Sequence, residues 1–297
     1  MYKPPKLLIC DLDNTLYDWV GYFVPSFYAM VDAVICLTGC DREALLDDFR
    51  RVHQKYHDCE HPFSLLETDL VKHAFPEKTH KEIAKELDSA FYAFNSMRKK
   101  VLRTYPGILD ALSIISENHI RLVAHTESNL YAVVDRLRRL DLARYFERIY
   151  CRQRPETNHP NRESVKDWFE DFPMERVVEL SLHQRKPDPS VLLEICEDLN
   201  TERSETAYIG DSIARDVLMA KRSDVFAIWA SYGTKHDPDK FRKLVRVTHR
   251  TKEDVKREEK LTEEGQSYKP DFVAESAFSD ILKLFGLPSQ NIHSSVA

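Results

Sequence analysis

The chain has 297 residues, with 43 Lys and Arg against 49 Asp and Glu, which gives a formal net charge of −6. This mild acidic excess makes the protein a poor candidate for a general nucleic-acid binder or a ligand of anionic membranes. The 7 glycines are too widely separated for the glycine-rich phosphate loops of dinucleotide-binding enzymes, P-loop enzymes or protein kinases. Any phosphate site must therefore be built in another way.

The cysteines and the apolar stretches bear on where the protein resides. The 6 cysteines show no C-x-x-C pair, no zinc-ligand spacing and no disulfide framework, which is typical of a reducing compartment. No secretory signal pattern follows the first residues. The longest apolar stretch begins at Trp19, and its interruption by Pro25 and Asp32 predicts that it is too short to span a bilayer. We therefore expect a cytoplasmic protein that does not enter a membrane.

Short apolar runs that end in polar residues recur along the chain, at residues 7–10, 120–124, 177–180, 207–209, 225–229 and 272–273. Because polar residues do not alternate within them, these runs are typical of strands buried on both faces of a parallel sheet. Helical patterns separate several of the runs, at residues 107–118, 129–141, 188–200 and 213–222. This alternation predicts an α/β fold with a Rossmann-like parallel sheet flanked by helices.

One interval is too long for simple alternation. The chain between Asp13 and Thr126 is several times longer than the ~30 residues that a βαβ unit needs. Apolar residues at three-to-four spacing predict that residues 17–103 are almost wholly helical. We predict an inserted helical cap domain over 17–103, and a catalytic core formed by residues 1–16 and 104–297.

Two further segments exceed this core. Residues 151–175 are polar and contain three prolines, and residues 234–270 include a run rich in Lys, Arg and Glu. Solvated surface explains both segments, and a lid or a partner surface is the alternative.

Two carboxylates, Asp11 and Asp13, follow the first predicted strand. In open α/β sheets, ligands bind beyond the carboxyl ends of the strands. A carboxylate pair at such a place can hold a divalent cation such as Mg²⁺. One of the two can instead be a nucleophile, because aspartate forms aspartyl-phosphate intermediates. For so short a motif, a surface turn is the alternative.

Three later strand ends carry polar groups of the same kind. Thr126 offers a hydroxyl after the second predicted strand, and Lys186 precedes a helix and supplies a point charge for phosphate. Asp211 and Asp216 form a second acidic pair after Gly210. Taken singly, each of these residues fits ordinary structure. Their order at successive strand ends predicts one shared site.

Together, these motifs resemble the haloacid dehalogenase superfamily of hydrolases. The matching residues are Asp-Leu-Asp-Asn-Thr at 11–15, Thr126, Lys-Pro-Asp-Pro at 186–189, and Gly-Asp-Ser at 210–212 with the following Asp216. The predicted helical insertion lies where this family carries an α-helical cap. The resemblance implies a phosphatase whose cap covers the site and excludes bulk water.

The resemblance also implies a role for each carboxylate. Asp11 would attack phosphorus and become phosphorylated, and Asp13 would be the general acid and base. Asp11, the main-chain carbonyl of Asp13 and Asp211 would hold Mg²⁺. Asp216 would be a more distant or water-mediated partner of the metal.

The remaining implied roles concern the phosphate. Thr126 and Lys186 would bind the phosphoryl oxygens, whereas Glu127 stands where many relatives carry a small or amide residue. A carboxylate there should repel phosphate unless it points away. Asp13 favours a phosphatase over a dehalogenase, because an alkoxide leaving group needs a proton and a halide does not.

We therefore expect a Mg²⁺-dependent phosphatase that acts on a small phosphorylated metabolite through an aspartyl-phosphate. A phosphomutase and a catalytically weak binding or regulatory protein are the alternatives. The substrate and the oligomeric state are left open.

Overall fold

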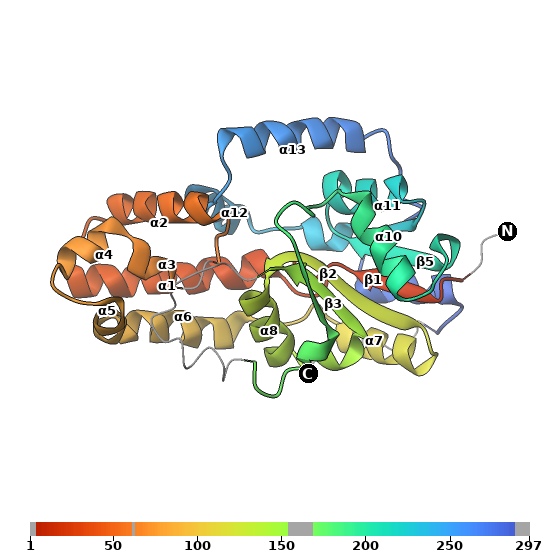
Figure 1. Cartoon of the computed structure of the whole chain (residues 1–297), viewed down its shortest axis with the longest axis horizontal. Helices are drawn as coiled ribbons and strands as arrows, with labels where there is room; N and C mark the ends of the chain where they lie inside the picture. Colours follow the sequence, from red (N-terminus) through yellow and green to blue (C-terminus); the bar gives the residue numbers. More distant parts are fainter. Residues whose placement is uncertain (1–3, 61–62, 154–168, 289–297) are drawn as a thin grey trace.

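The computed structural model describes residues 4–60, 63–153 and 169–288. Its centre is a parallel sheet of seven strands in the order β4-β3-β2-β1-β5-β6-β7 (Figure 1). The strands are β1 (Leu7–Cys10), β2 (Arg121–Asn129), β3 (Arg148–Arg152), β4 (Val177–Leu180), β5 (Thr206–Gly210), β6 (Phe226–Ala230) and β7 (Phe272–Ala274). The α/β class and the parallel sheet predicted from the sequence are confirmed.

The register of the central strands explains where the site forms. Cys10, the last residue of β1, pairs with Ala124 on one side and with Ile209 on the other. All four residues of β1 are buried, because helices cover both faces of the sheet. The residue that follows Cys10 therefore emerges between the carboxyl ends of two neighbouring strands.

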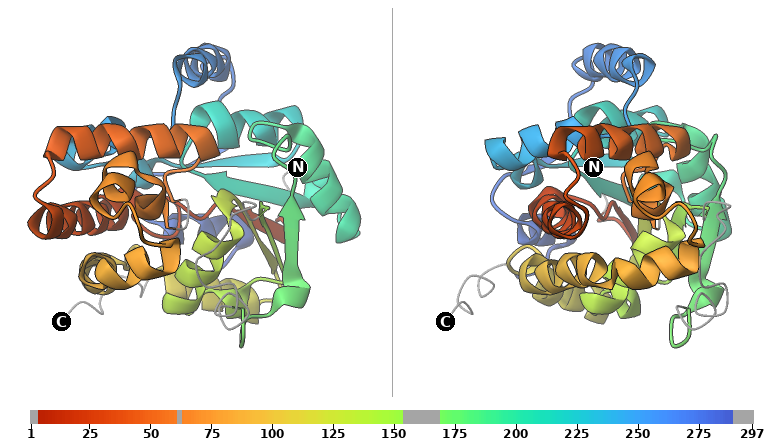
Figure 2. Two further views of the ribbon diagram at one scale, coloured as in Figure 1. Left: turned by 60° about the vertical axis from the view of Figure 1, so that its left-hand side comes forward. Right: turned by 90° about the vertical axis from the view of Figure 1, so that its left-hand side faces the viewer.

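Alternate side chains of β1 pack into two different hydrophobic clusters. Leu8 and Cys10 belong to the cluster that includes residues of α7 (Ile108–Glu117), α8 (Leu130–Arg139) and η6 (Phe278–Phe285). Leu7 and Ile9 belong to the cluster formed with α10, η4 and α11. These three elements are α10 (Pro189–Asp198), η4 (Ile213–Val217) and α11 (Leu218–Arg222). Figure 2 shows the resulting arrangement, with helices on both sides of the sheet.

The sequence pattern missed one strand and shortened another. β3 was not predicted, because its apolar centre is only three residues long and lies between Arg148 and Arg152. β2 continues past the predicted residue 124 to Asn129. Asn129 then caps α8 by accepting a hydrogen bond from the N–H of Ala132.

The chain between β1 and β2 is largely helical, as the periodicity predicts. Before α7, its helices are α1 (Trp19–Thr38), α2 (Arg42–Tyr56), α3 (Ser64–Glu67), α4 (Asp69–Ala74), α5 (His80–Glu86) and α6 (Asp88–Val101). The side chains of Asp18 and Asp41 cap α1 and α2, and Gly39 ends α1 with a φ of 67° that favours glycine. We call residues 17–103 the helical segment. Its separation as a cap domain stays a prediction.

One expectation about α1 is wrong. The helix continues through Pro25 and Asp32 for 20 residues, so the apolar stretch is not too short to span a bilayer. By length and composition α1 could cross a membrane, and half of its most apolar window is buried. A core helix of a soluble protein passes the same test, so this is weak evidence. The buried side of α1 packs against α6, which is the arrangement of such a core helix.

The charged segment 234–270 forms two helices, α12 (Pro238–Val247) and α13 (Lys252–Gly265). α12 packs against α1 and α2, whereas α13 packs against η4 beside the sheet. Between β6 and β7 the chain passes through α12, which lies beside α2 in Figure 1, and then through α13. The segment therefore bridges both parts of the molecule. Of the other additional segment, residues 154–168 lie outside the described residues.

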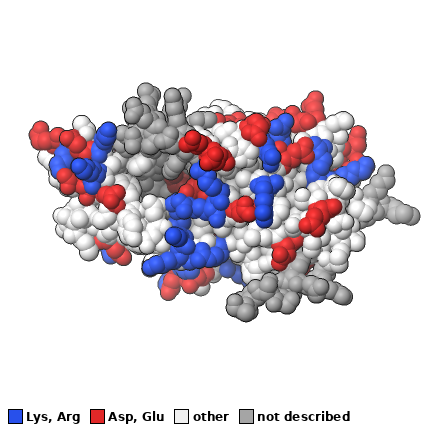
Figure 3. Space-filling view, turned by 90° about the horizontal axis from the view of Figure 1, so that it is seen from below, with Lys and Arg blue, Asp and Glu red and all other residues white. Residues whose placement is uncertain are grey.

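The surface carries charges of both signs. On the face drawn in Figure 3, Lys and Arg side chains gather near the middle, with Asp and Glu side chains around them. This mixture agrees with the modest net charge of the chain, −6.

Candidate active site

Asp11 is held at the carboxyl end of β1. Its N–H donates to the carbonyl of Ile209 at 2.9 Å, which continues the pairing of β1 with β5. Its side chain is buried and accepts hydrogen bonds from Thr15 Oγ1 at 3.0 Å and from Lys186 Nζ at 2.5 Å. Burial raises the pKa of Asp11 to about 7, although Lys186 opposes this shift.

Lys186 is shared between two carboxylates. Its ammonium lies 2.5 Å from Asp11 Oδ1 and 2.8 Å from Asp216 Oδ1. Burial alone would lower the pKa of Lys186, but Asp11 and Asp216 raise it well above its usual value. A buried lysine that stays charged is a suitable partner for a phosphoryl group.

Asp216 is fixed by the strand that precedes it. It accepts hydrogen bonds from the N–H of Ser212 at 2.9 Å and from the hydroxyl of Tyr208 at 3.2 Å. A Cβ atom at Gly210 would collide with Asp216, so the close approach requires glycine there. Asp216 is therefore held by Lys186, Ser212 and Tyr208.

Asp211 completes a group of carboxylates. One oxygen from each of Asp11, Asp211 and Asp216 lies within 4.8 Å of the others. Burial raises the pKa of Asp211 well above its usual value, and the charges of Asp216 and Asp11 add to this effect. Three crowded carboxylates supply the oxygen ligands that a hard divalent cation prefers. The carboxylate of Asp13 is not a member of this group.

Asp13 faces a different set of partners. Its Oδ2 accepts a hydrogen bond from Ser128 Oγ at 2.6 Å and another from Arg136 Nη2 at 3.4 Å. Arg136 projects from α8 and is almost completely buried. The two carboxylates of the first motif thus have different partners, Lys186 for Asp11 and Arg136 for Asp13.

Thr126 and Glu127 lie near the end of β2. The buried hydroxyl of Thr126 accepts a hydrogen bond from the N–H of Ser128 at 3.1 Å. Glu127 forms ion pairs with Arg215 at 3.3 Å and with Arg185 at 3.7 Å. These two arginines compensate the charge that the sequence placed beside the predicted phosphate site.

Sequence reasoning missed Arg136 and its acidic partner Glu60. Both oxygens of Glu60 lie 2.6 Å from Arg136 Nη1. A signal for Arg136 does exist, because it lies three residues after Val133 and next to Leu137, on the buried side of α8. No comparable signal exists for Glu60, which lies in a polar turn after α2.

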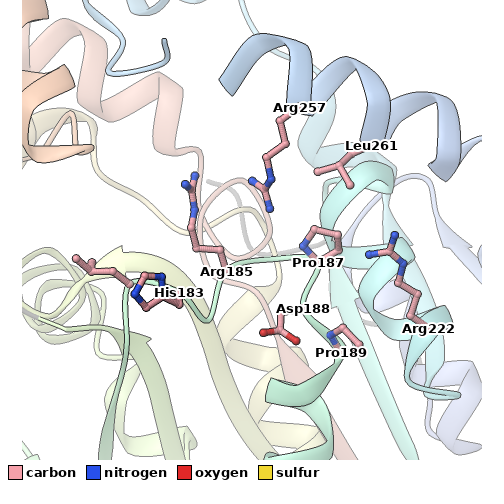
Figure 4. A pocket seen from close by; sticks show the side chains of 9 residues that line it. His183, Arg185, Pro187, Asp188, Pro189, Arg222, Arg257 and Leu261 are labelled. Carbon is pink, nitrogen blue, oxygen red and sulfur yellow. The ribbon is translucent and has the colours of Figure 1, made fainter. Parts of the chain in front are cut away.

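A hollow of about 460 Å³ lies behind the loop that carries Lys186 (Figure 4). Residues of this loop, of α11 and of α13 line it, and Arg257 reaches from α13 to donate to the carbonyl of Lys186 at 3.2 Å. The lining arginine Arg222 pairs with Glu264. The hydrogen bond from Arg257 therefore ties α13 to the backbone of Lys186.

These features define a protein with a parallel α/β sheet and an acidic, lysine-containing centre at the strand ends. A family model described as haloacid dehalogenase-like hydrolase matches residues 5–224, and a second model of similar hydrolases matches residues 183–278. The chain belongs to the haloacid dehalogenase-like hydrolases. The superfamily identified from the sequence motifs is confirmed.

Individual relatives agree with this class. The phosphoglycolate phosphatase of Agrobacterium fabrum is 27% identical over 233 residues, which is 76% of this chain and 81% of that protein. Phosphoglycolate phosphatase 1 of Pseudomonas aeruginosa is 26% identical over 235 residues, which is 78% of this chain and 71% of that protein. The predicted type of enzyme, a phosphatase, is confirmed by these relatives.

A solved structure shares the fold. The 2-haloacid dehalogenase from Pseudomonas syringae pv. Tomato matches with a TM-score of 0.56 at 20% identity. The match covers 96% of this chain and 99% of that one. It therefore includes both the sheet and the helical segment.

Proposed function

We propose that the protein is a Mg²⁺-dependent phosphatase that hydrolyses a small phosphate monoester through an aspartyl-phosphate on Asp11. One observation carries this proposal. The buried carboxylate of Asp11 lies 2.5 Å from the ammonium of Lys186, and one of its oxygens lies within 4.8 Å of an oxygen of Asp211 and of Asp216. A nucleophile in contact with both a cation and a metal-binding group is what phosphoryl transfer to a carboxylate requires. The similarity to phosphoglycolate phosphatases supports a small substrate.

The residues present fit a magnesium ion. Asp11, Asp211 and the main-chain carbonyl of Asp13 would hold it, and Asp216 would support the site from its place beside Lys186. All of these groups offer oxygen, as Mg²⁺ prefers. When bound, the ion would offset the repulsion between an anionic ester and the carboxylate of Asp11.

The chain supplies the remaining chemistry. Asp11 attacks phosphorus, the bond from phosphorus to the ester oxygen breaks, and Asp13 gives its proton to that oxygen, so an alcohol leaves. Water then attacks phosphorus, the bond to Asp11 breaks, and Asp13 accepts a proton from the water. Lys186 and Thr126 would bind the phosphoryl oxygens during both steps. Inorganic phosphate leaves, and both carboxyl groups return to their starting state.

The cellular location of the protein stays a prediction. A cytoplasmic location is supported by the six cysteines, all of which are described and none of which forms a disulfide.

A phosphomutase would use the same nucleophile, so the phosphatase and phosphomutase reactions differ only in the acceptor of the phosphoryl group.

The test is release of inorganic phosphate from a panel of small phosphate esters, with Mg²⁺ and with a chelator. We expect release that needs Mg²⁺ and that disappears in Asp11→Asn, while circular dichroism shows an unchanged fold. Asp110→Asn is the matched control, because it removes one exposed carboxylate from α7. Retained activity in Asp11→Asn would exclude the proposed nucleophile. Transfer of phosphate between sugar positions without release would favour the mutase.

A further inference from the structure

Arg136 joins the proposed acid and base Asp13 to a carboxylate from the helical segment. Nη2 of Arg136 contacts Asp13, and Nη1 contacts both oxygens of Glu60. The hydroxyl of Tyr22 donates to Glu60 at 2.6 Å and accepts from Arg136 Nη1 at 2.7 Å. Glu60 and Arg136 are 76 residues apart in the sequence. A core helix and the helical segment are thus linked through one guanidinium.

This guanidinium is firmly held. The side chain of Arg136 is 1% exposed, and that of Glu60 is 14% exposed. The rings of Tyr17 and Tyr22 lie 5.6 and 5.9 Å from the guanidinium carbon, within the range of cation–π attraction. A planar guanidinium whose partners are fixed in this way can orient a carboxylate that lies along one of its edges.

The charge balance argues against a role for Arg136 in binding a substrate anion. Two carboxylates, Asp13 and Glu60, already face its single positive charge. Burial alone would lower the pKa of Arg136, but these two carboxylates raise it well above its usual value. An additional anion would have to displace one of them.

The two oxygens of Asp13 differ in their hydrogen bonds. Its Oδ2 accepts hydrogen bonds from Ser128 and Arg136. Its Oδ1 is buried and accepts no hydrogen bond within the described ranges of the chain. The ion pair with Arg136 includes this oxygen as well, because Nη2 lies 3.4 Å from Oδ1, so the guanidinium faces both oxygens of the carboxylate and can set its orientation.

We propose that Arg136 is a positioning residue that aims Asp13 at the leaving oxygen, and that Glu60 of the helical segment holds Arg136 in place. This inference rests on the proposed phosphatase function. The step concerned is the first one, in which the bond between phosphorus and the ester oxygen breaks and the proton of Asp13 moves to that oxygen. A misplaced Asp13 slows this step most when the departing oxygen is strongly basic.

The experiment compares two esters in wild type, Arg136→Lys and Glu60→Gln. One ester is an alkyl phosphate chosen from the panel, whose alkoxide needs a proton, and the other is p-nitrophenyl phosphate, whose phenolate does not. The value of kcat/KM includes only steps up to departure of the alcohol, so it isolates the role of Asp13 as an acid. A general acid contributes ~10²–10⁴ in rate.

In Arg136→Lys we expect kcat/KM for the alkyl ester to fall about 10- to 100-fold, which is part of that contribution. We expect the value for p-nitrophenyl phosphate to fall less than about threefold. In Glu60→Gln we expect kcat/KM for each ester to change in the same direction as in Arg136→Lys, but by a smaller factor. This variant keeps the size of the side chain and only weakens the contact that holds Arg136.

The chain offers a matched control in the neighbouring residue of α8. Asp135 pairs with Arg98 of α6 at 2.7 Å, so Asp135→Asn also breaks an ion pair between α8 and the helical segment. It does not touch Asp13. We expect both esters to lose activity equally, or not at all, in this variant.

The possible results separate the inference from the function. Selective loss on the alkyl ester in Arg136→Lys, absent in Asp135→Asn, supports the inference. Equal loss on both esters in a folded Arg136→Lys protein overturns it, and so does a loss confined to substrates that carry a second anion. If wild type hydrolyses neither ester, the proposed function itself is wrong, and the inference is overturned with it.

Discussion

Lys186 and Asp216 form a buried ion pair, with 2.8 Å between Nζ and Oδ1. The sequence motifs imply separate duties for them, phosphate binding for Lys186 and remote metal support for Asp216. In the structure Asp216 instead touches the lysine directly and shares it with Asp11. The position of the lysine therefore depends on both carboxylates.

Asp216→Ala should destabilise the protein strongly. The change takes one of two carboxylates from the buried Lys186 and leaves the Ser212 N–H and the Tyr208 hydroxyl without their acceptor, and breaking a buried ion pair costs about 3–5 kcal/mol. Urea unfolding measures the loss, and activity should fall as well because Lys186 loses its fixed position. Asp239→Ala is the control, since its ion pair with Arg242 is exposed and should contribute less than about 1 kcal/mol. Equal stability of the two variants would contradict this account.

Glu127→Gln should have little effect on catalysis. Its charge is compensated by Arg215 and Arg185, at 3.3 and 3.7 Å. These ion pairs are partly buried but reached by solvent, and such pairs contribute about 0–1 kcal/mol, so we expect kcat/KM to change by less than about fivefold. Steady-state kinetics on the preferred ester provides the check. A large gain in substrate affinity would show that the carboxylate of Glu127 repels the phosphate after all.

Acid should weaken the contact between the helical segment and residues 247–249. His249 Nδ1 lies 3.1 Å from Cys59 Sγ, and His53 Nδ1 lies 2.7 Å from the carbonyl of Val247. Burial lowers the pKa of His249 to about 4, against the opposing effect of Asp58, and burial also lowers the pKa of His53.

The sign of the effect follows from proton binding. An unfolded histidine titrates near ~6.5, so between pH ~6.5 and about 4 the unfolded chain binds more protons than the folded one. Stability should therefore decrease as the pH falls through this window. Hydrogen exchange of α12 against pH measures the change, and His249→Asn should reduce the pH dependence. An identical profile for His249→Asn would contradict the assignment, and His73→Gln, at an exposed position of α4, is the control.

Phe49→Ala tests whether the helical segment is a unit of its own. Phe49 is fully buried in α2, and its ring centre lies 4.8 Å from that of Phe27. Its removal should destabilise the segment by about 3–5 kcal/mol. If residues 17–103 form a separate domain, hydrogen exchange should accelerate in α1, α2 and α12 and remain slow in β1. Uniform acceleration through the sheet would show one cooperative unit instead.

Much of the fold could be predicted because a buried parallel sheet leaves a local signal. Continuous apolar runs predicted six of the seven strands, and the long interval after Asp13 predicted the helical segment. β3 was not predicted, because its apolar part is only three residues long and is flanked by arginines. The packing of α12 and α13 against both the helical segment and the core was not predicted either. A charged run resembles solvated surface unless the partner of its apolar side is known.

The site, like the fold, could be predicted where the signal is local and not where it depends on tertiary packing. The sequence by itself determined which chemical groups stand at the strand ends, since parallel strands bring their carboxyl ends to one edge whatever the rest of the chain does. Only the tertiary structure decided which charges meet there. Lys186 pairs with Asp216, Asp13 faces Arg136, and Glu60 approaches from another part of the chain. Such pairs depend on the packing of distant elements, and periodicity within one element carries no information about a partner 76 residues away.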